Sequence, residues 1–195
     1  MSGRKKVAVL ISGRGSNMSA LIEAAKEEKF PVDISLVISN QPTAKGLETA
    51  RSHGIEAVAI DHAEFETRET FEQELHKTLV SRDIEMVACA GFMRKLTASF
   101  TRNWEGRMIN IHPSLLPKYK GLNTHQRALD AGDEEHGCTV HYVTAELDSG
   151  PVIMQASVPI LKGDTADDLA ARVLTEEHRI FPLALARVAE DLAGQ

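Results

Sequence analysis

Hydrophobic and polar positions in the first part of the chain alternate between two patterns. Short runs that are apolar at nearly every position are typical of buried strands, and longer segments with apolar residues three or four positions apart are typical of helices. The predicted strands cover residues 7–12, 34–39, 57–60, 86–90 and 107–111. The predicted helices cover residues 16–29, 44–53, 68–81 and 98–104. Because these strands are apolar throughout rather than alternating, we predict an α/β fold with a mostly parallel sheet and helices on both faces.

The rhythm changes after Pro117. Residues 122–131 have partly helical spacing, and residues 138–143 and 152–159 form two further apolar runs around a polar turn. A short connection of this kind favours antiparallel pairing. We therefore predict that an antiparallel strand pair follows the parallel part of the sheet.

A long helix is predicted for the last part of the chain. Thr165 precedes it and Asp168 follows three positions later, a spacing similar to a capping box. Pro182 lies inside the same apolar pattern. Because proline removes a backbone donor and crowds the preceding turn, we expect Pro182 to kink or divide this helix.

Composition narrows the class of protein. At 195 residues the chain is expected to form a single domain, residues 1–195, with a substantial core. Its 22 basic and 28 acidic side chains give a net charge of −6, which argues against broad nucleic-acid binding. No apolar run approaches the roughly 20 residues that span a bilayer. The basic start leads into a strand rather than a signal peptide, and Cys89 and Cys138 lie in apolar runs, so we expect reduced thiols and a cytoplasmic location.

The most informative segment is residues 110–117, Asn-Ile-His-Pro-Ser-Leu-Leu-Pro. Side chains alternate along a strand, so Asn110 and His112 point the same way while Ile111 faces the core. Pro113 then ends the strand pattern. An amide donor beside an imidazole can stabilise a carbonyl oxygen that gains negative charge. We expect this pair at the carboxyl end of a strand, where α/β sheets place their chemistry.

A histidine that acts near neutral pH needs an orienting group, and a carboxylate beside it fills that role. Asp148, in the turn between the last two predicted strands, is the candidate. Asp148 is equally explained as part of an Asp-Ser-Gly turn, and taken alone the turn is the simpler interpretation.

A glycine-containing loop, residues 12–17, joins the first strand to the first helix. Backbone N–H groups at such a helix start can bind a phosphate, although a tight turn with a capping side chain also explains the pattern. The loop lacks the Gly-Lys-Ser/Thr ending of a Walker loop and the third glycine of the dinucleotide fingerprint. No histidine or cysteine pair has zinc-ligand spacing, so no metal site is predicted.

Taken together, these motifs resemble the phosphoribosylglycinamide formyltransferases, the folate-dependent family of purine synthesis. The resemblance runs from about Lys6 to about Val188. It is carried by residues 13–17, 90–94, 110–117 and 146–151 and by the pair Glu177-His178. It implies a single-domain Rossmann-like formyltransferase fold, with a ribonucleotide phosphate site in the N-terminal half and the folate and catalytic sites in the C-terminal half.

The resemblance also implies substrates and residue roles. The co-substrate would be 10-formyltetrahydrofolate, and the amine of 5-phosphoribosylglycinamide would attack its formyl carbon directly. The catalytic residues would be Asn110, His112 and Asp148. The ribonucleotide-binding residues would be Gly15, Ser16, Asn17, Leu174, Thr175, Glu176 and Glu177. The folate-binding residues would be Arg68, Met93, Arg94, Lys95, Leu96, Asn110, Thr144, Ala145, Glu146, Leu147 and Asp148.

Three positions depart from the pattern of the family. Arg14 stands where relatives often carry asparagine, Asn123 where some carry histidine, and Ala145 where aspartate is common. These departures leave the expected reaction unchanged but bear on substrate affinity.

Other functions share parts of this pattern. A formyltetrahydrofolate hydrolase would resemble the same catalytic block but commonly carries an N-terminal regulatory domain, and transfer to an aminoacylated transfer RNA usually involves a C-terminal RNA-binding domain. A non-catalytic nucleotide-binding module is the alternative outside enzymes. We expect small-molecule substrates, no nucleic-acid or membrane partner, and a monomer or a homodimer.

Overall fold

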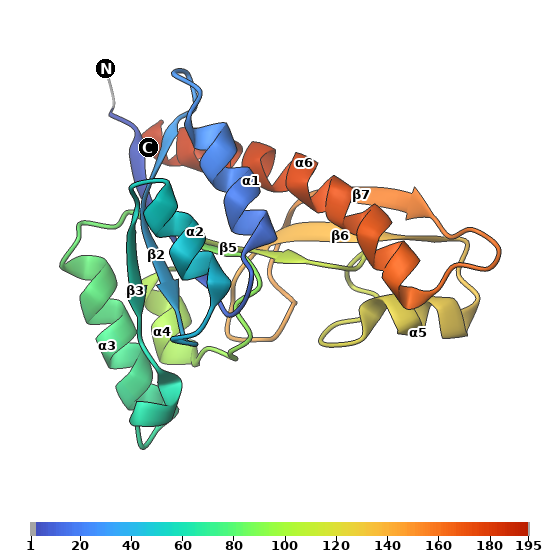
Figure 1. Ribbon diagram of the computed structural model, residues 1–195, viewed down its shortest axis with the longest axis horizontal. Coiled ribbons are helices and arrows are strands. Elements are labelled where there is room, and N and C mark those ends of the chain that lie inside the picture. Colours follow the sequence, from blue (N-terminus) through green and yellow to red (C-terminus); the bar gives the residue numbers. More distant parts are fainter. Residues whose placement is uncertain (1–2, 195) are drawn as a thin grey trace.

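The computed structural model describes residues 3–194 and contains one seven-stranded sheet in the order β3-β2-β1-β4-β5-β6-β7 (Figure 1). The first five strands pair in parallel, whereas β6 is antiparallel to both β5 and β7. The predicted α/β fold and its antiparallel strand pair are therefore confirmed. The strands are β1 (Lys5–Ile11), β2 (Val32–Ser39), β3 (Glu56–Ala59), β4 (Met86–Cys89), β5 (Met108–His112), β6 (Glu135–Tyr142) and β7 (Val152–Pro159).

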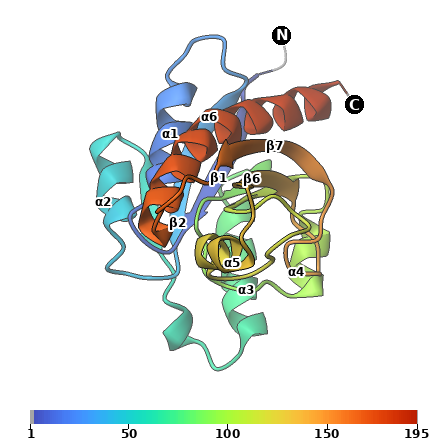
Figure 2. The ribbon, with the colours of Figure 1, turned by 90° about the vertical axis from the view of Figure 1, so that its right-hand side faces the viewer.

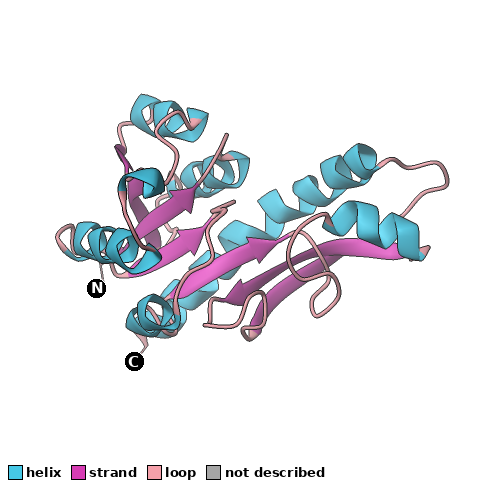
Figure 3. Cartoon of the chain, turned by 90° about the horizontal axis from the view of Figure 1, so that it is seen from below, coloured by secondary structure: helices cyan, strands magenta, loops and turns pink. Residues whose placement is uncertain are grey.

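Helices cover both faces of this twisted sheet (Figure 3). On one face α1, α2 and α6 contribute to a large apolar cluster, and on the other face α3 and α4 contribute to a second cluster. α1 and α6 pack side by side over the middle strands (Figure 2). The helices are α1 (Ser16–Ala25), α2 (Lys45–Ser52), η1 (His62–Glu64), α3 (Arg68–Val80), α4 (Ala98–Asn103), α5 (Thr124–Ala131) and α6 (Ala166–Ala193).

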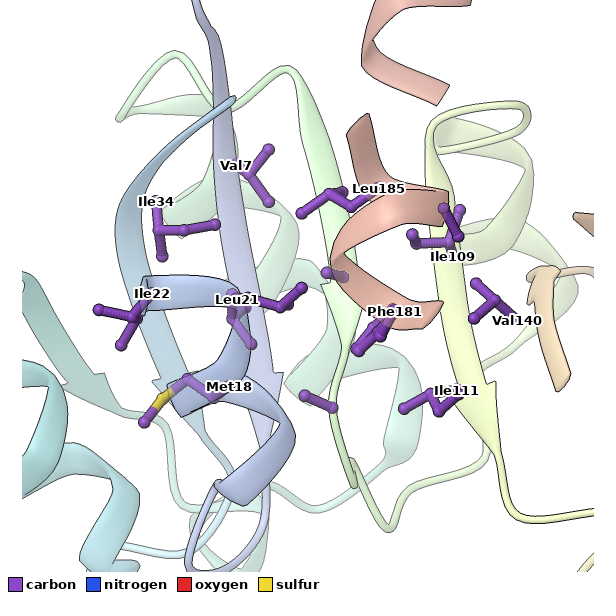
Figure 4. Packing of buried hydrophobic residues seen from close by; sticks show 14 of the residues in the cluster. Val7, Met18, Leu21, Ile22, Ile34, Ile109, Ile111, Val140, Phe181 and Leu185 are labelled. Carbon is purple, nitrogen blue, oxygen red and sulfur yellow. The ribbon is translucent and has the colours of Figure 1, made fainter. Parts of the chain in front are cut away.

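The core explains why the middle strands lack alternation. Residues 7–11 of β1 are fully buried because helices press on both sides of the strand. On one side Leu21 of α1 and Phe181 of α6 belong to the same apolar cluster, and Phe181 lies toward Ile111 of β5 (Figure 4). This packing positions the carboxyl end of β5, which carries Asn110 and His112, against the layer of helices.

Two helix predictions differ from the structure. α1 ends at Ala25 instead of continuing to Lys29, and the backbone N–H groups of Lys26 and Glu27 bond three residues back in a tightening turn. The charged residues 26–29 have no apolar face to bury, so packing gives them no reason to extend the helix.

Pro182 does not divide α6, which is assigned as one helix of 28 residues. Phe181 and Leu185, on either side of the proline, are fully buried in the core. Burial of these side chains outweighs the loss of one backbone hydrogen bond. The predicted capping box of Thr165 and Asp168 is present at the start of this helix.

Gly150 lies in the same turn as Asp148, between β6 and β7. A Cβ atom at this position would lie 1.8 Å from the carbonyl oxygen of Tyr142, which is backbone and cannot rotate away. We predict that Gly150→Ala lowers the free energy of unfolding by about 1–3 kcal/mol through overpacking. Urea unfolding measures the loss, with Gly194→Ala as control because its nearest atoms lie at 3.8 Å. Equal stability of the two variants would contradict the prediction.

Candidate active site

β5 delivers two polar side chains to the carboxyl edge of the sheet. Asn110 and His112 lie opposite His141 and Thr139 of β6, and residues paired in this way share a face. Ile111 between them is buried in the core, as the alternation of the strand predicts. The same edge receives the end of β1, since β1, β4 and β5 are parallel neighbours.

Asp148 folds against His112 although the two residues are 36 positions apart in the sequence. Its Oδ2 lies 3.5 Å from His112 Nδ1, and the two side chains are only 8% and 7% exposed. Oδ2 also accepts a hydrogen bond of 2.9 Å from the backbone N–H of Gly121. Asp148 has φ 47°, a left-handed conformation that aspartate tolerates better than most residues. The structure thus brings together the three residues predicted to be catalytic.

Both ring nitrogens of His112 face oxygen atoms. Nε2 lies 2.9 Å from the carbonyl oxygen of Tyr119, and because a carbonyl only accepts, Nε2 carries the proton. Nδ1 faces the Asp148 carboxylate. A protonated imidazole, which has an N–H on each nitrogen, therefore finds an acceptor on both sides.

His141 is a second imidazole ring in this cluster, and the sequence did not single it out. Its Nδ1 lies 2.9 Å from the Tyr142 carbonyl oxygen, and its Nε2 lies 3.1 Å from Asn110 Nδ2 and 3.7 Å from Asp148 Oδ1. Burial lowers the pKa of His141 below 6.5, outweighing the raising effects of the Tyr142 carbonyl and Asp148. The signal that could have found it is the pairing of β6 with β5, which places His141 opposite Asn110.

A cavity of about 100 Å³ opens beside Asn110 and Asp148. The predicted folate-binding residues that line it are Arg94, Lys95, Leu96, Asn110, Thr144, Ala145, Glu146, Leu147 and Asp148. The lining residues that sequence reasoning missed are Cys89, Phe92, His141 and Val143. His112 is not among the residues that line the cavity, and its ring contacts the Asp148 carboxylate.

Two residues predicted to bind folate lie outside this lining. Met93 is 67% exposed, and its backbone N–H donates to Ser12 Oγ at 2.7 Å, which ties this loop to the end of β1. Arg68 is exposed at the first position of α3. The folate-binding roles of Met93 and Arg68 stay predictions.

The two thiols are buried and unpaired. Burial raises the pKa of Cys89 to about 12, and burial together with Glu177 raises that of Cys138 to about 12. A thiol is nucleophilic as its thiolate, so neither cysteine is suited to covalent catalysis near neutral pH.

The glycine loop ends at the N-terminus of α1. Gly15 is the N-cap residue with φ 72°, and no side chain caps the helix. Ser16 and Asn17 form the first turn, and no acidic residue lies there to occupy the helix start. Exposed N–H groups at a helix N-terminus favour an anion.

Asn17 connects this loop to the last helix. Its Nδ2 donates to Glu177 Oε2 at 2.6 Å, and both side chains are buried. The Oδ1 atom of Asn17 is buried without a hydrogen-bond partner. Burial raises the pKa of Glu177 above 4.5, which the hydrogen bond from Asn17 partly opposes.

No hydrogen bond joins the other predicted residues on α6 to the glycine loop. Thr175 is exposed and bonds its hydroxyl to Ala171 of its own helix, and Glu176 pairs with Arg179 at 2.5 Å. Leu174 is half-buried. Of the predicted ribonucleotide-binding residues on α6, only Glu177 forms a hydrogen bond with Asn17.

Residues 3–194 lack two kinds of feature. No helix there combines the length and apolarity needed to cross a bilayer. No group of three or more His, Cys, Asp or Glu side chains in that range is arranged to hold a metal ion.

Comparison with known proteins identifies relatives over nearly the whole chain. The formyl transferase family matches residues 5–185. The phosphoribosylglycinamide formyltransferase of Escherichia coli (strain K12) is 49% identical over 94% of this chain and 87% of its own length. The trifunctional purine biosynthetic protein adenosine-3 of Drosophila melanogaster is 48% identical, but this chain spans only 14% of its length.

Solved structures agree with this relationship. The phosphoribosylglycinamide formyltransferase from Brucella melitensis is 48% identical over 95% of this chain and 96% of its own, with a TM-score of 0.92. The glycinamide ribonucleotide transformylase 1 from Symbiobacterium toebii is 41% identical over 98% of this chain and 90% of its own, with a TM-score of 0.95. On these grounds the chain belongs to the phosphoribosylglycinamide formyltransferase family.

Proposed function

We propose that this protein transfers the formyl group of 10-formyltetrahydrofolate to the amine of 5-phosphoribosylglycinamide, a step of purine biosynthesis. The observation that carries the proposal is the contact of 3.5 Å between Asp148 and His112, next to a cavity that Asn110 lines. The family membership supports the choice of reaction.

Asn110 and His112 act on the carbonyl oxygen in this proposal. The substrate amine attacks the formyl carbon, and the carbonyl oxygen gains negative charge in a tetrahedral intermediate. Asn110 donates a hydrogen bond to that oxygen, and protonated His112 supplies positive charge and a proton. Since His112 Nε2 donates to the Tyr119 carbonyl in this structure, direct donation requires exchange of that hydrogen bond.

Asp148 stabilises the positive ring and orients it through Nδ1. When the intermediate collapses, the oxygen returns its proton to His112 as the carbonyl re-forms, and the bond between the formyl carbon and the folate nitrogen breaks. The proton lost by the attacking amine balances the proton gained by that nitrogen, with water as the carrier. Attack is direct and no enzyme-bound formyl group is required.

The two substrates would enter from neighbouring parts of the same sheet edge. The phosphate would lie on the backbone N–H groups at the start of α1 and on the side-chain donors of Ser16 and Asn17, with Gly15 in the turn before them. Glu177 would accept hydrogen bonds from ribose hydroxyls. This assigns the phosphate site to the N-terminal half, with Glu177 and its neighbours on α6 completing it. The folate would occupy the cavity between the segments 92–96 and 143–148.

The phosphate loop gives a prediction of its own. Ser16→Ala and Asn17→Ala should each raise the dissociation constant for the ribonucleotide by roughly 10-fold to 100-fold, as for loss of a hydrogen bond to a charged group. Titration calorimetry measures the affinity, with Ser52→Ala on α2 as a matched control for Ser16→Ala. An unchanged affinity in both loop variants would remove the glycine loop from the site.

One assay separates the proposed transfer from hydrolysis and from a non-catalytic module. Purified protein is mixed with 10-formyltetrahydrofolate alone, with 5-phosphoribosylglycinamide added, or with charged transfer RNA added. We expect formyl loss to be fast only with the ribonucleotide. Equal formyl loss without any acceptor would indicate a hydrolase, and no loss under any condition would indicate a binding module. The cytoplasmic location and the choice between monomer and homodimer stay predictions.

A further inference from the structure

The two ring nitrogens of His141 have different partners, and these partners define its tautomer. Nδ1 lies 2.9 Å from the Tyr142 carbonyl oxygen, an atom that accepts but never donates, so Nδ1 carries a hydrogen. In a neutral ring Nε2 is then a lone-pair acceptor. Its neighbour at 3.1 Å is the Nδ2 amino group of Asn110, which donates.

The charged and titratable groups around His141 fit a neutral ring. Asp148 Oδ1 lies 3.7 Å from Nε2, His112 stands on β5, and the Cys89 thiol of β4 lines the same cavity. Asp148 favours protonation of His141, whereas His112 and burial oppose it, and burial is the largest effect. His141, with a side chain 3% exposed, is therefore poorly placed to exchange protons with water.

This hydrogen bond decides which end of the Asn110 carboxamide faces the ring. A carboxamide has an acceptor oxygen and a donor NH₂ group, and rotation by a half turn exchanges them. Against a lone pair on Nε2, only the orientation with NH₂ toward His141 forms a hydrogen bond. One hydrogen of Nδ2 is then used by His141, and the second hydrogen of the same group stays available in the cavity that both residues line.

We propose that His141 is a positioning residue: as a neutral ring with its hydrogen on Nδ1, it fixes the Asn110 carboxamide so that an N–H faces the reacting carbonyl oxygen. This inference rests on the proposed function for its consequence in catalysis. The hydrogen-bond pattern itself is independent of the reaction and can be tested without turnover.

The first test uses the unmodified protein and needs no substrate. Two-dimensional NMR of protein with ¹⁵N-labelled histidine distinguishes the three protonation states of each ring. At pH 7 we expect the His141 signals, assigned by their loss in His141→Gln, to show a neutral ring with hydrogen on Nδ1. A hydrogen on Nε2, alone or together with one on Nδ1, would overturn the inference.

The second test separates positioning from general structural support. His141→Ala should lower kcat by about 10-fold to 100-fold, somewhat less than loss of an oxyanion donor itself, with the folate dissociation constant within about twofold of wild type. His141→Gln should restore most of kcat because its carboxamide oxygen can accept from Asn110. If the alanine variant fails to fold, the glutamine variant and the NMR measurement still decide the question.

A double-mutant cycle with Asn110→Ala completes the design. Since His141 acts through Asn110, the double variant Asn110→Ala/His141→Ala should be no slower than Asn110→Ala alone. Multiplication of the two single losses would show that His141 contributes separately and would overturn the inference. If wild-type protein shows no formyl transfer, the proposed function fails, while the NMR result still decides the tautomer.

Discussion

Replacing His112 with alanine is expected to lower kcat by about 100-fold to 10,000-fold, the range for loss of a general acid–base group. The imidazole contacts Asp148 but is not part of the cavity lining, so its loss should leave folate binding nearly unchanged. The loss then resides in the chemical step, where the ring stabilises developing negative charge.

Steady-state kinetics at saturating substrates, together with a folate dissociation constant from fluorescence titration, tests this expectation. His53→Ala is a matched control, because His53 lies at the exposed end of α2. Turnover of His112→Ala equal to that of wild type would remove His112 from the catalytic set.

Asp148→Asn is expected to lower kcat by at least about 100-fold. The change removes the negative charge that faces His112, so a positive charge on the His112 ring is less stabilised. Asparagine keeps the size of the side chain, tolerates the left-handed backbone, and can still accept from the Gly121 N–H. The variant should therefore fold, and its loss of turnover reports on charge.

The same kinetic measurements apply to this variant, with Asp83→Asn as control. Asp83 is exposed, also has a positive φ, and pairs with Lys6 at 3.8 Å. It lies between α3 and β4 and is not one of the candidate site residues. A kcat for Asp148→Asn within twofold of wild type would show that the carboxylate charge has no part in catalysis.

Most of the fold could be predicted because its middle strands, β1 and β4, are buried on both faces. Fully apolar runs such as residues 7–11 indicate a covered parallel sheet whatever the tertiary detail. The exceptions lie where packing overrides local preference. Burial of Phe181 and Leu185 keeps α6 continuous across Pro182. Local sequence preferences do not include the free energy of this burial.

The candidate site could be predicted where its residues share one strand. The alternation of β5 places Asn110 beside His112, and this needs no knowledge of the rest of the chain. Asp148 was a candidate only because a turn residue can fold back, and its contact with His112 depends on the β6–β7 connection. The resemblance to a known family, rather than residue spacing, assigned Asp148 to the catalytic set.

The contact of His141 with Asn110 could not be predicted from the sequence of its own strand. Within β6 it is a histidine in an apolar run, which gives no indication of a partner. Its importance follows from the antiparallel register that sets it opposite Asn110. The bond between Asn17 and Glu177, which joins residues 160 positions apart, is equally invisible before the helices are packed.

The fate of the formyl carbon in a single turnover tests the central claim most directly. Excess protein is mixed with ¹³C-formyl-labelled 10-formyltetrahydrofolate and 5-phosphoribosylglycinamide, and the reaction is stopped at successive times for mass spectrometry. We predict that the label appears in the formylated ribonucleotide at the rate at which it leaves folate, with none attached to protein. Label recovered as formate, or held on the protein before it reaches the ribonucleotide, would contradict direct transfer.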